Sequence, residues 1–130
     1  MEQSPSLSAP FTARALAELA IPRDLPPAQT KAIIADALQE VGLTAMADDP
    51  VRILSGGQQR RAHMARALTQ LMAGRALGGG IALILDEPTA GLDLSHQITA
   101  LEAAQSAAMK GAAVIVALHD LNLAAAYADR

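Results

Sequence analysis

The sequence contains no cysteine and no tryptophan, and its only phenylalanine and tyrosine are Phe11 and Tyr127. The absence of cysteine excludes disulfides and thiolate metal sites. Because 52% of the residues are hydrophobic but only 2% are aromatic, the core must consist of Ala, Leu, Ile and Val, with helices that pack closely. A chain of 130 residues fits one small domain or part of a larger one.

The chain also lacks an excess of positive charge and a long apolar run. A formal net charge of −3 gives no electrostatic case for nucleic acid as the main partner. No run approaches the ~20 apolar residues of a membrane-spanning helix. The first residues have neither the basic start nor the apolar centre of a signal peptide. We therefore expect a soluble, cytoplasmic protein that reaches a membrane only through another protein.

The first half of the sequence predicts helices. One spans 13–20 and is capped by Thr12; a second spans 28–41 and ends at Gly42. A third should run from Gly56 to about Met72, and Gly74 with the three glycines 78–80 should mark its end. The side chains expected to form its apolar stripe are Ala65, Leu68 and Met72. Those expected to point elsewhere are Arg60, Arg61 and His63.

The second half changes pattern. The runs 81–85 and 112–118 are short and wholly apolar, which is typical of parallel strands covered on both faces. Between them, Asp93 starts a helix that Gly111 stops, and a last helix begins at Leu121. The sequence thus predicts a helical part followed by an α/β part, and we divide the chain into residues 1–74 and 75–130.

Two stretches contain candidate functional residues. Ser55-Gly56-Gly57 places small residues at a helix N-terminus, where open backbone N–H groups and the helix dipole attract phosphate; alone, it could equally be a Ser cap followed by loop glycines. Asp86-Glu87 follows the first apolar strand, at the edge where open α/β sheets bind ligands. Carboxylates suit a hard cation and a general base, although two solvated loop carboxylates are the plain alternative.

Together these stretches resemble the ATP-binding-cassette (ABC) ATPases. The resemblance lies in a signature motif and a Walker B strand, which here read Leu54-Ser55-Gly56-Gly57-Gln58 and Ile81-Ala82-Leu83-Ile84-Leu85-Asp86-Glu87. It implies the C-terminal part of a P-loop NTPase (RecA-like) core with parallel strands, preceded by the ABC α-helical subdomain. It also implies that the signature residues bind, in trans, ATP held by a second subunit. These residues are Ser55, Gly56, Gly57 and Gln58.

The same resemblance implies roles for single residues. Asp86 would hold Mg²⁺ through water, and Glu87 would act as the general base toward the attacking water. His119, after the second strand, matches the switch histidine that contacts the γ-phosphate, although a lone strand-end histidine is more often structural. Asp93 matches the D-loop at the dimer interface. Gln3 matches the Q-loop glutamine that senses Mg²⁺ and the attacking water.

Within the family, the chain looks most like the ATP-binding subunits of bacterial haem importers; ferric-siderophore and cobalamin importers are close alternatives. The segments that carry this likeness are 10–12, 92–97 and 119–125. The implied partners are a second ATP-binding subunit in a head-to-tail homodimer, membrane-spanning permease subunits and, indirectly, a periplasmic binding protein. The implied location is peripheral, on the cytoplasmic face of the inner membrane.

The family's phosphate-binding loop, Gly-x-x-x-x-Gly-Lys-Ser/Thr, is absent, since the only lysines are Lys31 and Lys110 and neither follows a glycine-rich turn. We therefore expect an internal piece of a cassette ATPase that does not hydrolyse ATP alone. Two hypotheses follow: a piece of a working importer ATPase, or a non-catalytic truncated remnant. A DNA-repair or translation ATPase is a third class, which the acidic balance disfavours.

Overall fold

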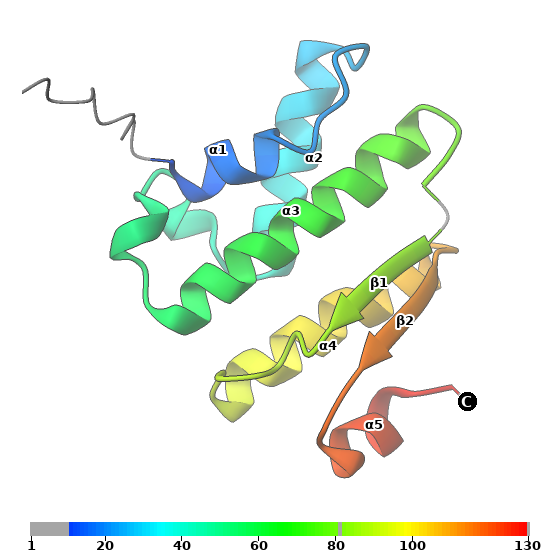
Figure 1. The fold of residues 1–130 in the computed structure, drawn as a ribbon. Helices are drawn as coiled ribbons and strands as arrows, with labels where there is room; N and C mark the ends of the chain where they lie inside the picture. The colour runs from blue at the N-terminus through cyan, green and yellow to red at the C-terminus, as the bar shows by residue number, and fades with distance from the viewer. Residues whose placement is uncertain (1–10, 81, 130) are drawn as a thin grey trace, which may run out of the picture.

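The structure is a computed structural model that describes residues 11–80 and 82–129. Figure 1 shows α3 running between a layer of two helices, α1 and α2, and a second layer made of the strands and α4. The elements in chain order are α1 (Ala13–Glu18), α2 (Pro27–Glu40), the 3-10 turns η1 (Thr44–Met46) and η2 (Val51–Ile53), α3 (Gly56–Ala76), β1 (Ala82–Asp86), α4 (Leu94–Met109), β2 (Ala113–Ala117) and α5 (Leu121–Tyr127).

The predicted Thr12 cap and the predicted stop at Gly42 are confirmed, although α1 ends at Glu18 and not at residue 20 as predicted. The Thr12 hydroxyl accepts a hydrogen bond of 3.0 Å from the N–H of Ala15, which satisfies one of the donors that a helix start leaves open. At the end of α2, Gly42 adopts φ +67, a left-handed conformation that glycine takes at little cost. The chain then folds back, so that the N–H of Leu43 donates to the carbonyl of Leu38 at 2.8 Å.

The predicted end of the third helix is wrong, because α3 continues through Gly74 to Ala76. Gly74 allows close backbone approach instead of ending the helix. A Cβ at Gly74 would lie 3.1 Å from the Cα of Gly80, and the N–H of Gly79 donates to the Gly74 carbonyl at 2.8 Å. The glycine run 78–80 is therefore the turn that folds the chain back against α3 before β1 starts.

Arg61 is buried, contrary to the prediction that it points away from the core. Only 5% of its surface is exposed, and its Nη1 donates to the carbonyls of Val41 at 2.9 Å and Gly42 at 3.1 Å. Carbonyls at a helix C-terminus lack intrahelical donors and carry the negative end of the dipole. Burial lowers the pKa of the Arg61 guanidinium, and the charge of Asp93 opposes that shift. Arg61 thus joins the end of α2 to α3.

Replacing Arg61 by Leu is expected to lower the free energy of unfolding by about 2–3 kcal/mol, because two hydrogen bonds from a charged donor, one of them buried, are lost. Chemical denaturation followed by circular dichroism measures the change. Arg60, its exposed neighbour on α3, provides the control, and Arg60→Leu should change the same quantity by less than about 0.5 kcal/mol. Equal effects of the two substitutions would contradict the assigned role of Arg61.

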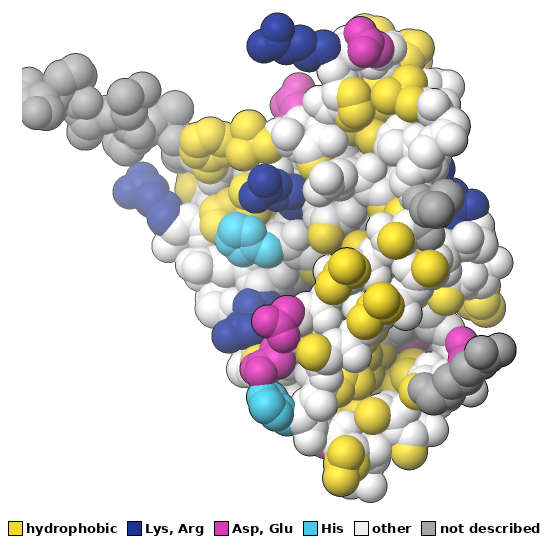
Figure 2. All heavy atoms as spheres, turned by 45° about the vertical axis from the view of Figure 1, so that its right-hand side comes forward, with side chains coloured by type: hydrophobic (Ala, Val, Ile, Leu, Met, Phe, Trp, Pro, Cys, Tyr) yellow, Lys and Arg dark blue, Asp and Glu magenta, His cyan; other side chains and the backbone are white. Residues whose placement is uncertain are grey.

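The strands β1 and β2 pair in parallel, as predicted, with Asp86 opposite Ala117. The prediction that they are covered on both faces is wrong for the described residues. Side chains alternate along a strand. The helices that contact the strands are α3, against β1, and α4, against β2, and they cover only the face to which Leu83 points. On the other face, Ile84 is 72% exposed and Ile115 is 64% exposed. Figure 2 shows apolar side chains over this open face.

One apolar cluster runs through both layers, from Ala13 in α1 to Ala112 before β2. As the composition predicts, alanine and leucine dominate it, and close packing of α3 against α1 and α2 supplies most of the helical layer. None of the helices among the described residues combines the length and the hydropathy that crossing a membrane requires.

Candidate functional site

The parallel pairing brings the ends of both strands to one edge of the sheet. Because Asp86 pairs with Ala117, Glu87 and the residues that follow β2 leave the sheet side by side. The N–H of Glu87 donates to the carbonyl of Ala117 at 3.0 Å, so this alignment extends one residue past β1. Two segments that lie about thirty positions apart in sequence thus meet where open parallel sheets place their ligands.

Glu87 has a strained backbone. Its φ of +46 is the only positive value at a non-glycine residue among the described positions, and such a conformation costs on the order of 1 kcal/mol or more. A tight turn follows, in which the N–H of Ala90 donates to the Glu87 carbonyl at 3.1 Å. Strain of this kind persists where the surroundings enforce it, and it clusters at functional sites.

The structure brings together the two residues predicted to be catalytic. Nε2 of His119 lies 2.5 Å from Oε1 of Glu87, and the side chains are 85% and 43% exposed, respectively. His119 is held between the end of β2 and α5, whose first turn is capped by Oδ1 of Asp120 accepting from the N–H of Asn122 at 2.8 Å. The pair is a carboxylate oriented by an imidazole and open to solvent.

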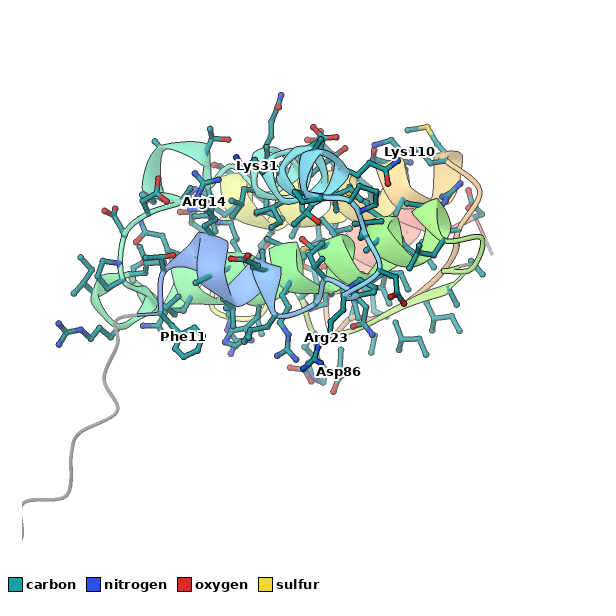
Figure 3. The ribbon with its side chains drawn as sticks, turned by 90° about the horizontal axis from the view of Figure 1, so that it is seen from above. Phe11, Arg14, Arg23, Lys31, Asp86 and Lys110 are labelled. Carbon is teal, nitrogen blue, oxygen red and sulfur yellow. The ribbon has the colours of Figure 1, made fainter. Side chains whose placement is uncertain are left out.

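Asp86 ends β1 with an exposed carboxylate, and Figure 3 shows it at the edge of the molecule. Within 11–80 and 82–129, no hydrogen bond or ion pair engages its side chain, and no three His, Asp or Glu residues are grouped as a metal cage. Gln3, the other predicted metal contact, lies outside the described residues. One carboxylate with room around it fits Mg²⁺, which typically combines one or two carboxylates with waters and phosphate oxygens.

The first turn of α3 is held by a capping box. The Ser55 hydroxyl accepts from the N–H of Gln58 at 3.2 Å, and Oε1 of Gln58 accepts from the N–H of Ser55 at 2.8 Å. The N–H groups of Gly56 and Gly57 take part in no hydrogen bond within the described part of the chain. A Cβ at Gly56 would meet nothing within 4 Å, so this helix start presents open donors toward solvent.

This helix start packs against the segment that precedes α4. A Cβ at Gly57 would lie 3.0 Å from Cδ2 of Leu92, and one at Gly91 would lie 3.7 Å from Nε of Arg60. Leu92 is only 8% exposed, which fixes the segment against α3. The predicted signature turn and the predicted D-loop are thus direct neighbours within one chain.

Asp93 caps α4, as predicted, and has a partner that the sequence analysis missed. Its Oδ1 accepts from the N–H of His96 at 2.9 Å, and its Oδ2 lies 2.8 Å from Nδ1 of the same residue. These hydrogen bonds, with smaller contributions from the charges of His96 and Arg61, lower the pKa of the Asp93 carboxyl. The i,i+3 spacing of an acid and a histidine at a helix start could have indicated the pair.

The lowered pKa of Asp93 predicts a pH effect on stability. Because the folded state favours the carboxylate, its contribution is complete above the ordinary pKa of 3.8 and is lost as the pH falls through the lower pKa of the folded state. Asp93→Asn keeps a capping side chain without the charge. The difference in unfolding free energy between the parent chain and this variant should therefore shrink as the pH falls below 3.8; a difference that stays the same or grows below pH 3.8 would contradict the assignment.

Comparison with known proteins agrees with this geometry. Residues 1–90 match the family described as ABC transporter. The hemin import ATP-binding protein HmuV of Rhodopseudomonas palustris is 45% identical over 130 residues, covering 100% of this chain and 48% of that protein. The chain therefore spans about half the length of the curated relatives it matches.

Two solved structures are similar in fold. A bacterial ABC transporter cassette solved as a dimer is 25% identical, with a TM-score of 0.72 over 88% of this chain and 48% of that one. The protein cbiO1 of Clostridium perfringens, part of the complex cbiONQ, is 28% identical, with a TM-score of 0.64 over 88% and 43%. The predicted resemblance and fold class, part of a P-loop NTPase core preceded by helices, are confirmed.

Proposed function

The chain belongs to the ABC transporter family, and we propose that it is a piece of the ATP-binding subunit of an importer that couples ATP hydrolysis to the uptake of hemin. The proposal of ATP hydrolysis is supported by the Glu87–His119 pair at the ends of two parallel strands. The cargo rests on the 45% identity to a hemin import protein. A ferric siderophore or cobalamin is the alternative cargo, because none of the residues assigned to ATP would contact the cargo.

In the proposed site, Glu87 is the general base that removes a proton from the attacking water. His119 positions the Glu87 carboxylate through the 2.5 Å contact and supplies a donor toward the γ-phosphate. Asp86 would hold Mg²⁺ through water, and the ion when bound would neutralise charge on the phosphates. Gln3 would complete the contacts to the ion and the water. A general base contributes about 10²–10⁴-fold to a rate, which is the share we assign to Glu87.

We assign the open helix start of α3 to ATP held by a second subunit. Ser55 and Gln58 fix the turn through the capping box, so that the N–H groups of Gly56 and Gly57 are directed at phosphate. Asp93, beside this turn through Leu92, would lie at the subunit boundary. A head-to-tail homodimer follows, and the similar cassette solved as a dimer supports it.

The further partners we propose are membrane-spanning permease subunits and, indirectly, a periplasmic binding protein. The subunit would then be peripheral, on the cytoplasmic face of the inner membrane. Membership of a multi-subunit transporter is supported by the similar protein that forms part of the complex cbiONQ. The division of the chain into a helical part, 1–74, and an α/β part, 75–130, remains a prediction.

The alternative is a non-catalytic remnant, because the sequence holds no Gly-Lys-Ser/Thr loop to grip the β- and γ-phosphates. Reading the DNA upstream of Met1 in the same frame distinguishes the two. An open frame with such a loop supports a working ATPase, whereas stop codons directly upstream support the remnant.

The cargo is tested by transport. The whole ATPase, purified with its permease subunits, is reconstituted into vesicles with ATP inside and given hemin or a ferric siderophore through the binding protein. We expect ATP-dependent accumulation of hemin only. Uptake of the siderophore without hemin uptake would replace the proposed cargo but leave the proposed ATPase intact, whereas an absence of ATP hydrolysis would contradict the catalytic assignment.

A further inference from the structure

A cavity of about 290 Å³ opens between α2, α3 and α4. One side of it is apolar and is formed by Leu68, Leu71 and Met72 of α3, with Ala107 of α4 opposite. None of the residues assigned to ATP lines this cavity. Figure 3 shows that Lys110, at its mouth, lies on the opposite side of the molecule from Asp86. The cavity is therefore separate from the residues assigned to ATP.

The other side of the cavity is polar, and its four polar side chains are linked. Nζ of Lys110 lies 2.8 Å from Oε1 of Glu40, and the hydroxyl of Ser106 donates to the same oxygen at 3.2 Å. Arg75 donates from Nη2 to the backbone carbonyl of Lys110. These contacts hold the polar side chains at one end, so the cavity has an apolar interior and a hydrophilic mouth.

The mouth has an excess of donors and of positive charge. Two cations, Lys110 and Arg75, face one carboxylate, Glu40. An ammonium has three N–H donors and a guanidinium has five, whereas the contacts within the cavity use one of each. The unused donors and the uncompensated charge suit an anionic head group, above all a carboxylate, which an arginine can bind with two hydrogen bonds.

The surroundings limit the ligand to a single charge. The adjoining groove, which shares Glu40 and Lys110 with the cavity, is also lined by Asp36 and Glu102. These carboxylates would repel a second negative charge outside the mouth. Because the same acids would attract a cationic head group, an amine with the same tail is the ligand to compare with the carboxylate.

We propose that this cavity binds a small monocarboxylate with an unbranched apolar tail, of the size of a medium-chain fatty acid. The tail would lie against Leu68, Leu71 and Met72, and the carboxylate would lie between Lys110 and Arg75. An apolar cavity of about 150 Å³ holds benzene, so 290 Å³ has room for a chain of roughly eight carbons. Binding would hold α2 and α3 against α4.

The head group is tested with three ligands that share one tail. Octanoate, octylamine and octanol are titrated into this chain and into the whole ATPase, with binding followed by calorimetry. We expect saturable binding of octanoate to both proteins, at least about tenfold tighter than that of octylamine, because unlike charges attract and like charges repel at the mouth. Stronger binding of octylamine, equal binding of all three ligands, or binding to this chain but not to the whole ATPase would overturn the proposal.

Two substitutions that break the same ion pair should act in opposite directions. Lys110→Gln removes a positive charge and is expected to weaken octanoate binding several-fold. Glu40→Gln removes the negative charge and is expected to tighten it several-fold. Because both variants lose the Glu40–Lys110 contact, structural damage alone would change both affinities in the same direction. That result would contradict the proposal that the carboxylate of the ligand lies beside Lys110.

The apolar end is tested by filling it. Ala107 is 6% exposed and lines the cavity, so Ala107→Leu should abolish octanoate binding and raise Tm. Gln105→Leu adds the same side chain at an exposed position of α4, and this variant should bind octanoate as the parent does. Unchanged binding by Ala107→Leu with a raised Tm would overturn the proposal, because the variant would then be folded with its cavity filled.

Discussion

In the whole ATPase, Glu87→Gln is expected to lower kcat for ATP hydrolysis by about 10²–10⁴-fold, the contribution of a positioned general base. Glutamine keeps the shape of the side chain but cannot accept the proton of the attacking water. Because the substitution changes neither the size of the side chain nor the residues assigned to phosphate, ATP binding should persist. Steady-state phosphate release measures kcat, and nucleotide binding is measured separately by calorimetry.

Two further variants make this result specific. His119→Ala leaves the carboxylate but removes the group that lies 2.5 Å from it, so its loss in kcat should be smaller than that of Glu87→Gln. Glu18→Gln neutralises an exposed carboxylate on α1, away from the strand ends, and should leave kcat unchanged. If Glu87→Gln kept full activity, Glu87 would not be the base.

Gly56→Ala is expected to lower ATP hydrolysis by the whole ATPase about 10²-fold. The added methyl group would keep the phosphate away from the open N–H groups, and the effect should be comparable to losing one backbone donor at a site of developing charge. Nothing in the chain itself opposes the new methyl group, since a Cβ there meets no atom within 4 Å. Alanine is also a better helix former than glycine, so stability should rise by up to about 1 kcal/mol. Activity would thus fall while the Tm of this chain stays equal or rises.

The matched variant is Gly57→Ala. Its Cβ would lie 3.0 Å from Cδ2 of Leu92, so Leu92 must shift by a few tenths of an ångström, and Tm should rise less than it does in Gly56→Ala while activity falls. Thermal unfolding of this chain and ATPase assays of the whole protein therefore separate the two glycines. Full activity of Gly56→Ala would contradict the proposal that this helix start binds ATP held by the second subunit.

Much of the candidate site follows from local sequence. An apolar run that ends in two carboxylates predicts a strand with its acids at the edge of a sheet, and a second such run places His119 at the same edge once the strands are parallel. Capping is equally local: the hydroxyl of Ser55 and the carboxylate of Asp93 reach backbone N–H groups three residues ahead. Such contacts depend on near neighbours in the chain, which sequence displays directly.

Other features depend on which distant segments meet. Helical periodicity assigns Arg61 to a polar position, yet it is buried because the end of α2 brings two carbonyls to it. Glycine at position 74 predicts a helix end, yet α3 continues to Ala76, and the missing side chain lets the backbone of Gly80 come close to Gly74. The positive φ of Glu87 also leaves no mark in the sequence, because the sheet and the following turn impose it.

The sequence by itself determined the family, the parallel strands and the residues Glu87 and His119 at their ends, because these rest on residue types and on spacing along the chain. Only the tertiary structure decided that the two side chains touch, that Arg61 is buried, that one face of the strands around Ile84 stays open and that a cavity lies beside Lys110. The physical reason is that burial and distance depend on the packing partner that arrives from elsewhere in the chain, which the local pattern does not specify.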